Sequence, residues 1–562
     1  MKKLFYIALC AIFFASCSDK AYEEINTDPT KAAQVNAASQ LSYAELQIFG
    51  DMNYVDVHRL YTFAFTQHLM GCWNTTNYGG QHRSDDNEMS RPWNNLYPAS
   101  IRNLTDAISQ TKGVPEQVNV YAALRIFRVY VGGLLVDYYG DIPFSEAGLA
   151  YLSGNSKPKY DTQDSLYIYF FQELKEAASL FDINANAITS DPLFNGDINK
   201  WKTFANTLRL RYAMRISDVL PAKAKAEFTA AIGDGVMSSA SDDACVKHMN
   251  VNYSFGQDSY KDFRGNALSK YFFGNDPANN PTYICKTFWD QLYNNNDPRT
   301  TRLFRFYIDD YMSLSTGDGR IDMTDAVIAT QKANPGAAVI STVSPGMFSW
   351  DEWPSYPELP GSALAKRVEE VQAAHPNYKP GDNPRWLKPK LANNFLRSDN
   401  PGVLMTYAEV CFLRAEAALL GWTSENAKGL YEEGIRASMD FLSDYYDCAG
   451  ITADEYNTYI GQPGIAFNAA NAKAQINTQA WILHFHNPAE AWANVRRADY
   501  PALVGPDPAQ EKTKPMDGVQ DIPVRLCYPL KEETYSKDEY QAAKARVSGD
   551  YNWHARLWWD VK

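Results

Sequence analysis

The chain has 562 residues, of which 45% are hydrophobic and 21% are charged, and its formal net charge is −13 at pH 7. An acidic chain without Lys/Arg runs is a poor candidate for binding nucleic acid or anionic lipid headgroups. Its length exceeds what one compact core usually accommodates, so we expect a multilayer or repeat-built body.

The first 17 residues carry the pattern of a lipoprotein export signal. Two lysines precede an apolar run, residues 4–14, that is too short to span a bilayer, and small residues then lead to Cys17. Such signals are cut before the cysteine, whose sulfur takes up diacylglycerol. We therefore expect a signal peptide at 1–16, lipidation at Cys17 and a single exported body at 17–562. Because Phe14 stands where these signals usually carry Leu, an ordinary secretory peptide with an incidental cysteine is the alternative.

Three helices are predicted in the first half of the body. Residues 122–139 are apolar nearly all round and are followed by Gly140 and Pro143, which indicates a buried helix. A second helix follows Asp161, and a third covers residues 201–219, each with apolar side chains at helical spacing. We expect all three to face the core, and no apolar stretch after the signal to span a membrane.

A helix pair is predicted in the second half. An Ala-rich helix at 407–420 is followed by a second helix that runs to residue 442, with Ser424 as its N-cap. The short connection indicates antiparallel neighbours. Tyr431 and the small residue Gly434 fall near the aromatic and small positions of a tetratricopeptide repeat, although no regular 34-residue period is present.

Long connections rich in Gly, Pro, Asn and Trp separate these helices. We expect strands and loops there, and we expect the loops to carry function. They cover residues 72–98, 250–281, 309–394 and 499–530.

Short stretches along nearly the whole chain resemble the SusD/RagB family of outer-membrane lipoproteins, in its SusD-like branch. One such stretch is weak support, but several in the same order are strong. They are EEINTDPTKA, DYYGDIPFSEAG, KPKYDTQDSLYIYFFQELKEA, GDINKWKTFANTLRLRYAMRISDV, MTYAEVCFLRAEAALLGW, YEEGIRASM, EAWANVRRADYP, RLCYPLKEE and LWWD.

The resemblance implies a mainly α fold of tetratricopeptide-like antiparallel helix pairs with long irregular loop insertions. It further implies a lipid-anchored, non-catalytic protein of the outer membrane that needs no cofactor. Such a protein captures nutrient and delivers it to a SusC-type TonB-dependent porin. Surface-exposed members often carry several acidic residues after the lipid cysteine, whereas residues 18–20 offer a single aspartate beside a lysine. Outward exposure is nevertheless our expectation.

Three patterns imitate chemical sites, and we interpret each as structural. Asp141 and Glu146 lie close together after a helix end, where a turn explains them better than a catalytic pair. The stretch 314–325 imitates a calcium loop but begins with leucine where the first carboxylate belongs. His484 and His486 lack further metal ligands at suitable spacing.

Other residues are expected in the core. Arg496 and Arg497 are interpreted as a buried cation pair that binds carbonyls and carboxylates. The tryptophans at helical positions and the terminal pair Trp558–Trp559 are expected to pack inside. The cysteines after Cys17 show no CxxC or metal-ligand spacing, so no disulfide framework or metal site is predicted.

Aromatic side chains in two of the long connections are the ligand-binding candidates, because proline and glycine break regular packing around them. Tyr and Trp make up 49 residues (36 plus 13), and their flat faces suit the apolar faces of sugar rings. SusD-like relatives build an aromatic sugar platform from loops in these two regions. The candidates are Trp73, Tyr78, Trp350, Trp353 and Tyr356, with Trp386 as a weaker sixth.

Four functions compete at this point. Capture of an oligosaccharide for a partner porin leads, and capture of peptide by the same scaffold, as in RagB-like relatives, is close behind. A surface glycoside hydrolase stays open, because paired glycosidase carboxylates leave no reliable spacing. Pure scaffolding through the helix pairs would leave the aromatic loops without a role.

Overall fold

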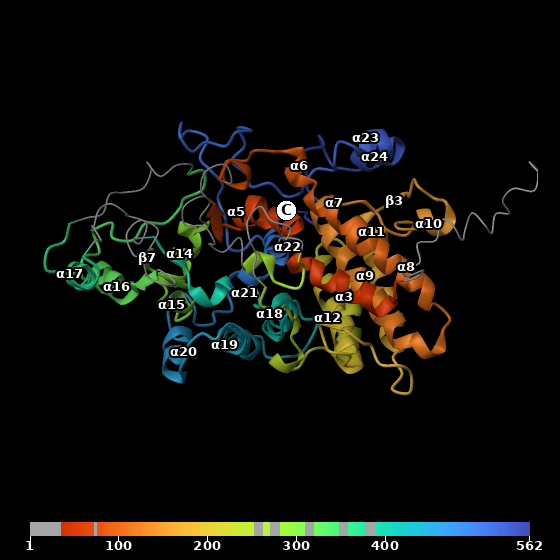
Figure 1. The fold of residues 1–562 in the computed structure, drawn as a ribbon, viewed down its shortest axis with the longest axis horizontal. Coiled ribbons are helices and arrows are strands. Elements are labelled where there is room, and N and C mark those ends of the chain that lie inside the picture. Colours follow the sequence, from red (N-terminus) through yellow and green to blue (C-terminus); the bar gives the residue numbers. More distant parts are fainter. Residues whose placement is uncertain are drawn as a thin grey trace, which may run out of the picture.

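The computed structural model describes residues 35–71, 76–251, 262–269, 282–309, 320–347, 358–376 and 388–561. The body is mainly helical, with short two-stranded antiparallel sheets between the helices (Figure 1). The expected fold class is therefore confirmed.

The helices and strands are distributed along the whole described chain. In the first half the helices are α3 (Ala37–Gly50), α4 (Met52–Val57), η1 (His58–Thr62), α5 (Phe63–Phe65), η2 (Thr76–Gly80), α6 (Asp86–Met89), α7 (Arg91–Leu96), η3 (Tyr97–Ile101), α8 (Arg102–Thr111), η4 (Pro115–Gln117), α9 (Val118–Tyr139), α10 (Ala150–Ser153), α11 (Gln163–Ser179), α12 (Ile198–Arg215), α13 (Pro221–Asp234) and η5 (Ala240–Asp242). In the second half they are α14 (Lys286–Tyr293), α15 (Thr300–Leu303), α16 (Thr324–Ala333), α17 (Ala363–Ala374), η11 (Asn393–Leu396), α18 (Tyr407–Leu419), α19 (Ala427–Tyr446), α20 (Ala453–Ile460), α21 (Ala472–Leu483), η12 (His484–His486), α22 (Pro488–Ala498), α23 (Glu532–Tyr535) and α24 (Lys537–Ala545). The paired strands are β1 (Leu69–Gly71) with β5 (Thr282–Ile284), β2 (Ile142–Pro143) with β3 (Tyr160–Asp161), β4 (Ala244–Val246) with β10 (Gly402–Met405), β6 (Phe304–Arg305) with β9 (Lys390–Leu391), and β7 (Tyr307–Asp309) with β8 (Arg320–Asp322).

The helix at the centre of the first half is α9, and it is buried almost throughout. It is the one described helix, counted from Pro115 to Tyr139, that is long and apolar enough to cross a membrane. We expected no segment after the signal to be long and apolar enough to span a membrane, and by length and composition α9 is such a segment. However, 78% of its apolar window is buried against other helices of the body. The side chains of Phe144 and Tyr212 lie against Gly132 and Gly133, where a larger residue would not fit. These contacts are those of a core helix.

The predicted helix pair is confirmed as α18 and α19. Tyr407 at the start of α18 contacts Glu433 in α19, and Arg414 further along α18 contacts Glu425 just before α19, so the two segments run in opposite directions. The expected N-cap at Ser424 is wrong, because Asn426 is the residue that precedes α19. The chain first closes α18 with a turn at Gly421 (φ +66°), in which the Trp422 amide donates to the Ala417 carbonyl. Ser424 falls in the connection that follows.

The long connections hold more helix than expected. The segment 72–98 contains η2, α6 and α7, and the side chain of Asp85 caps α6 by accepting from two backbone amides. The segment 309–394 contains α16 and α17, and Ser362 caps α17. By contrast, the described segment 499–530 has neither helix nor strand.

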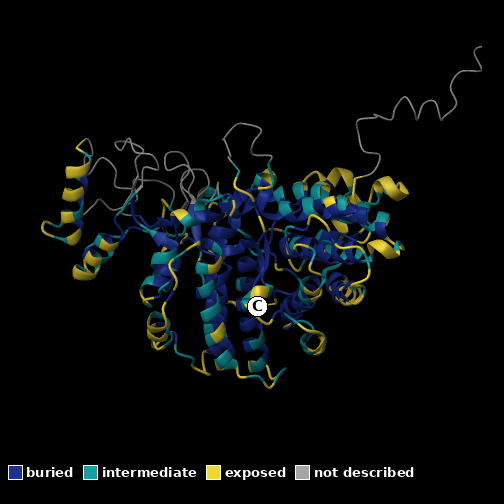
Figure 2. Cartoon of the chain, turned by 60° about the horizontal axis from the view of Figure 1, so that its bottom comes forward, coloured by how far each residue is buried: buried dark blue, intermediate teal, exposed yellow. Residues whose placement is uncertain are grey.

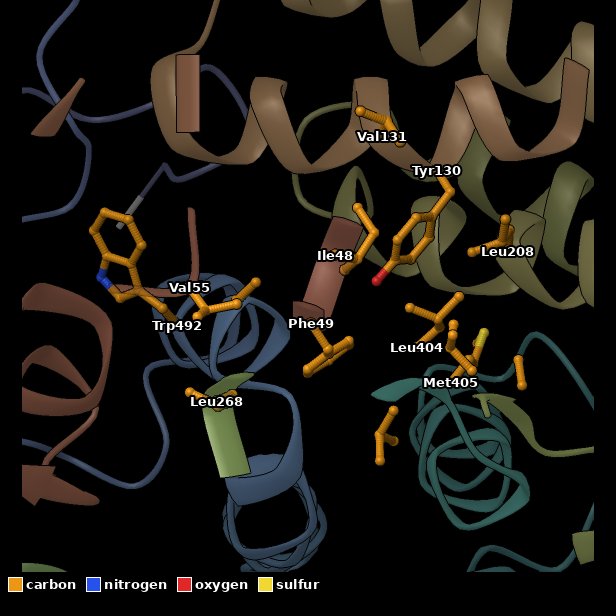
Figure 3. Packing of buried hydrophobic residues seen from close by; sticks show 14 of the residues in the cluster. Ile48, Phe49, Val55, Tyr130, Val131, Leu208, Leu268, Leu404, Met405 and Trp492 are labelled. Carbon is orange, nitrogen blue, oxygen red and sulfur yellow. The ribbon is translucent and has the colours of Figure 1, made fainter. Parts of the chain in front are cut away.

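One large apolar core joins the two halves. Figure 3 shows Phe49, Tyr130 and Trp492, which belong to three different helices, among the buried residues of this core. Figure 2 shows that buried residues fill the centre of the body. Charged pairs lie inside it. Arg211 forms a bidentate ion pair with Glu409, with N···O distances of 2.7 and 2.8 Å, and both side chains are 4% exposed. A buried pair of this kind is very costly to break from one side only.

Candidate ligand-binding site

A small sheet and a bridge form the base of the candidate site. In the sheet of β1 and β5, Met70 lies opposite Tyr283. Cys285, directly after β5, bridges Val343 in parallel, and the Lys286 amide donates to the Val343 carbonyl at 2.7 Å. We call the buried apolar residues that pack beneath this sheet and bridge the loop-anchor cluster. Met347 packs against this cluster. The cluster consists of Ala64, Met70, Tyr283, Cys285 and Val343.

Gln81 ties three distant segments together beside this cluster. Its buried side-chain amide donates to the carbonyl oxygens of Gly346 at 2.8 Å and Lys512 at 3.3 Å. The backbone carbonyl of Gln81 accepts a hydrogen bond from the Met516 amide at 2.7 Å. Gly346 has φ +84°, and a side chain there would collide with the backbone of Thr513. Residues 81, 346 and 512–516 are thus held in one fixed arrangement.

The loop-anchor cluster lies beside described residues that directly precede or follow the segments carrying the aromatic candidates. Gly71 and Thr76 flank the segment of Trp73, and Met347 precedes the segment of Trp350, Trp353 and Tyr356. The ammonium of Lys388, which follows the segment of Trp386, lies 5.4 Å from the centre of the Tyr283 ring. The five candidate residues named here lie outside the described residues, so their role stays a prediction. The described flanks nevertheless come together from three parts of the chain.

Tyr78 is the one candidate side chain within the described residues. It is half-buried, its ring meets Tyr61 edge to face at 5.8 Å, and the Arg83 guanidinium lies 5.0 Å from the ring centre. Burial, together with the nearby Glu88 carboxylate, raises the pKa of its hydroxyl. Tyr78 therefore packs against the core with part of its ring, and its remaining surface is free to contact solvent.

An open polar groove begins at the same cluster, on the outer face of α14. Its volume is about 530 Å³, and Ser344 and Pro345 line it together with side chains of α14 and the turn after it. Gln291, Asn294 and Asn295 supply amides that can both donate to and accept from hydroxyl groups. Sequence reasoning missed this groove, although the run Asn294–Asn296 was a visible signal.

A second groove of about 630 Å³ adjoins the first along α14 and shares Lys286, Asp290 and Asn294 with it. It is lined in part by Trp289 and Tyr293, whose rings stack at 5.3 Å with an angle of 17° between their planes. Trp289 is buried, whereas Tyr293 is half-buried, and burial raises the pKa of the Tyr293 hydroxyl. The α14 region thus combines aromatic faces with amides, as sites for polar, ring-containing ligands do.

The cluster also has a cationic edge. Lys388 and Lys390 are both buried, and burial lowers the pKa of the Lys390 ammonium to about 7. The charge at this edge therefore changes in the neutral pH range.

Two of the three patterns interpreted as structural lie within the described residues, whereas the stretch 314–325 lies in part outside them, at 314–319, so its interpretation stays a prediction. Asp141 accepts from the Gln163 amide at 3.0 Å and pairs with Arg546, while Glu146 accepts from the Lys159 amide at 3.1 Å. The corner interpretation is confirmed. The ring of His486 stacks on Tyr446 at 4.9 Å inside the core.

The expected buried cations are also confirmed. Arg496 donates to the carbonyls of Asp137 and Val524 at 2.8 and 2.7 Å, and Arg497 pairs with Glu416. The expected core tryptophans Trp93, Trp201, Trp481 and Trp559 are all at most 5% exposed. The expectation for Trp558 is wrong, because its side chain is only half-buried and lines a groove. The described cysteines at 245, 285, 411, 448 and 527 are free thiols.

The comparisons with known proteins agree with this architecture. A family model described as starch-binding and associating with the outer membrane matches residues 29–341 and 376–529. A solved SusD-like structure from Bacteroidetes has 72% sequence identity and a TM-score of 0.89, over 94% of this chain and 100% of that one. A chitin-binding protein has 31% identity and a TM-score of 0.73 over the same shares.

A SusD homologue from Bacteroides uniformis, at 22% identity, shows the fold alone, with a TM-score of 0.66 over 94% of this chain and 99% of that one. No curated protein matches the chain. Because the family model covers most of the chain and a structure at 72% identity carries the same name, the chain belongs to the SusD-like family of outer-membrane-associated proteins.

Proposed function

We propose that this protein captures an oligosaccharide at the cell surface and passes it to a SusC-type TonB-dependent porin. The family supports a glycan ligand and an association with the outer membrane. The observation that carries the proposal for this chain is the convergence at Gln81 and the loop-anchor cluster. It brings the flanks of the aromatic segments to one place, next to the amide-lined groove of α14.

The cargo we propose first is an oligomer of N-acetylglucosamine. The reason is the 31%-identical relative that is named as a chitin-binding protein. N-acetylated sugars combine an apolar ring face with amide groups. Trp and Tyr rings suit the former, and the side chains of Gln291, Asn294 and Asn295 suit the latter.

The location follows from the N-terminal pattern. Residues 1–16 are proposed as the signal peptide, Cys17 as the lipid attachment point, and 17–562 as one SusD-like body facing the cell exterior. Because α9 is buried in the core, the lipid is the proposed membrane attachment.

No catalysis is proposed. The most suggestive carboxylates by sequence, Asp141 and Glu146, are both engaged in holding backbone amides. A binding role needs a rigid site that leaves its ligand intact, and this agrees with the family.

The experiment is calorimetric titration of the purified protein with chitin oligosaccharides, maltooligosaccharides and unrelated peptides, followed by chromatography of each ligand. We expect binding of a glycan that is recovered uncut. Binding of peptides alone would replace the glycan by a peptide cargo. Reproducible cleavage that is lost on substituting one carboxylate would make the protein an enzyme.

A further inference from the structure

Three side chains of metal-binding type meet beside the segment 499–530. His82 follows η2, Asp517 lies in this segment, and His554 lies near the C-terminus. One ring nitrogen from each histidine and one carboxylate oxygen all lie within 4.8 Å of one another. His554 Nε2 is 2.8 Å from one oxygen of Asp517, and His82 Nδ1 is 3.7 Å from the other.

The surroundings hold the Asp517 carboxylate in place. The buried Trp553 donates its indole hydrogen to Asp517 Oδ2 at 3.0 Å, and the Val519 amide donates to Oδ1 at 3.0 Å. The Val519 carbonyl lies 2.9 Å from His82 Nδ1. The hydrogen bonds from Trp553 and Val519 thus orient the Asp517 carboxylate, as hydrogen bonds around a metal site orient its ligands.

The group is also reachable from solvent. His82 is buried, but the Asp517 and His554 side chains are 24% and 19% exposed. His554 lines two grooves, of about 930 and 420 Å³. A hydrated ion therefore has access to the ligand atoms.

We propose that His82, Asp517 and His554 bind one divalent transition-metal ion of the zinc type. Two imidazoles and a carboxylate are a common ligand set for such ions, and solvent supplies the remaining position. With bonds of about 2.0 to 2.2 Å, ligand atoms on a tetrahedral ion lie about 3.4 Å apart. A pair 4.8 Å apart must close by about 1.4 Å, which a side-chain rotation in the exposed Asp517 or the half-buried His554 supplies.

Binding requires one change of hydrogen position. His82 Nδ1 faces the Val519 carbonyl as a donor, so coordination through Nδ1 moves the ring hydrogen to Nε2, breaks this hydrogen bond and turns the ring toward the ion. The consequence for the fold is local. His82 adjoins Gln81, and Asp517 adjoins Met516, which bonds to Gln81. A bound ion would thus clamp the segment 512–517 onto the loop-anchor cluster, independently of which ligand the protein captures.

The competing interpretation is a metal-free hydrogen-bond network in which Asp517 accepts from Trp553 and His554. Titration of chelator-treated protein with zinc chloride separates the two. The substitutions are Asp517→Asn, which keeps one acceptor oxygen for Trp553 and His554, and His554→Gln. His375→Ala, a half-exposed histidine at the end of α17, controls for adventitious binding.

We expect one zinc ion per chain, affinity weakened at least about tenfold by Asp517→Asn and by His554→Gln, and wild-type affinity in His375→Ala. Zinc should raise the melting temperature of the wild type and not that of Asp517→Asn, since an ion that binds only the folded state stabilises it. Melting curves in chelator show whether each variant is folded. Absence of stoichiometric binding, or binding that survives both substitutions, would overturn the proposal.

Discussion

The side-chain amide of Gln81 donates a 2.8 Å hydrogen bond to the carbonyl oxygen of Gly346, 265 residues further along the chain. The same amide reaches the Lys512 carbonyl, so one side chain fixes the relative positions of three segments. A binding surface built from separate loops needs such fixed supports, because ordering loops on binding costs free energy.

Gln81→Ala is expected to weaken glycan binding at least about fivefold, because the flanks of the aromatic segments lose their tie. The melting temperature should fall modestly, because leaving a carbonyl without its hydrogen-bond partner lowers the free energy of unfolding by about 1 to 3 kcal/mol. Calorimetry and thermal denaturation measure both. Gln475→Ala is the matched control, because Gln475 ties the carbonyls of residues 464–466 elsewhere in the fold. Equal loss of binding in both variants would argue for a general effect on stability.

The contact of Gly434 with Phe412 sets the spacing of the α18–α19 pair. A side-chain carbon at position 434 would lie 2.6 Å from the Phe412 ring, so Gly434→Ala should destabilise the protein by about 1 to 3 kcal/mol through overpacking. Gly233→Ala, at an exposed helical position with no neighbour within 4 Å, should instead stabilise by about 0.5 to 1 kcal/mol. Urea denaturation of both variants checks the opposite signs. A stabilised Gly434→Ala would show that the helices are not in close contact there.

Asp243 gives the stability a defined pH dependence. Burial, reinforced by Asp242 and Asp444, raises the pKa of its carboxyl from 3.8 to about 7. A carboxyl that holds its proton more tightly when folded stabilises the fold at low pH and loses this contribution as the pH rises through 7. Asp243→Asn keeps an acceptor for the Tyr407 amide, which bonds to Asp243 at 2.7 Å.

The difference in melting temperature between Asp243→Asn and the wild type should therefore grow from about pH 4 to about pH 7 and then level off. The exposed Asp550→Asn serves as the control and should show a flat difference. A flat profile for Asp243→Asn as well would mean that this carboxyl is already charged in the fold at low pH.

Much of the helical body could be predicted from the sequence. The 3.6-residue spacing of apolar residues marks α9, α11 and α18, because each buries one face or all of its surface. The prediction placed the end of α12 at residue 219, whereas the helix ends at Arg215, since Ile216 leaves the helical region. Periodicity does not report such a local change of backbone.

The site was less accessible to sequence reasoning. The aromatic candidates stand out by composition, but the contacts that bring their flanks together join residues hundreds of positions apart. Gln81 has no local signal, since a glutamine that bonds distant carbonyls looks like any other polar residue. The group of His82, Asp517 and His554 could not be predicted either, because the three residues lie far apart in the sequence and form no spacing typical of metal ligands.

The lipid anchor is tested by Cys17→Ser. Because one sulfur is the proposed attachment point, the variant should lack incorporated fatty acid and leave the membrane fraction. Labelling with radioactive palmitate and detergent partitioning measure this. Ser18→Ala, beside the cysteine, is the control and should be processed normally. Membrane retention of Cys17→Ser equal to that of the wild type would contradict the anchor.

The central claim is that the aromatic segments that flank the loop-anchor cluster hold the glycan. The most direct measurement is calorimetric titration of the Trp73→Ala, Trp353→Ala double variant with the chitin oligosaccharide that the wild type binds. Stacking of one ring contributes about 1 to 3 kcal/mol, so losing two rings should weaken binding at least about 30-fold. The melting temperature should stay within about two degrees of the wild type, and Trp422→Ala, whose half-buried ring packs on Phe228, should bind normally. Unchanged affinity of the double variant, or a large fall in its melting temperature, would contradict the account.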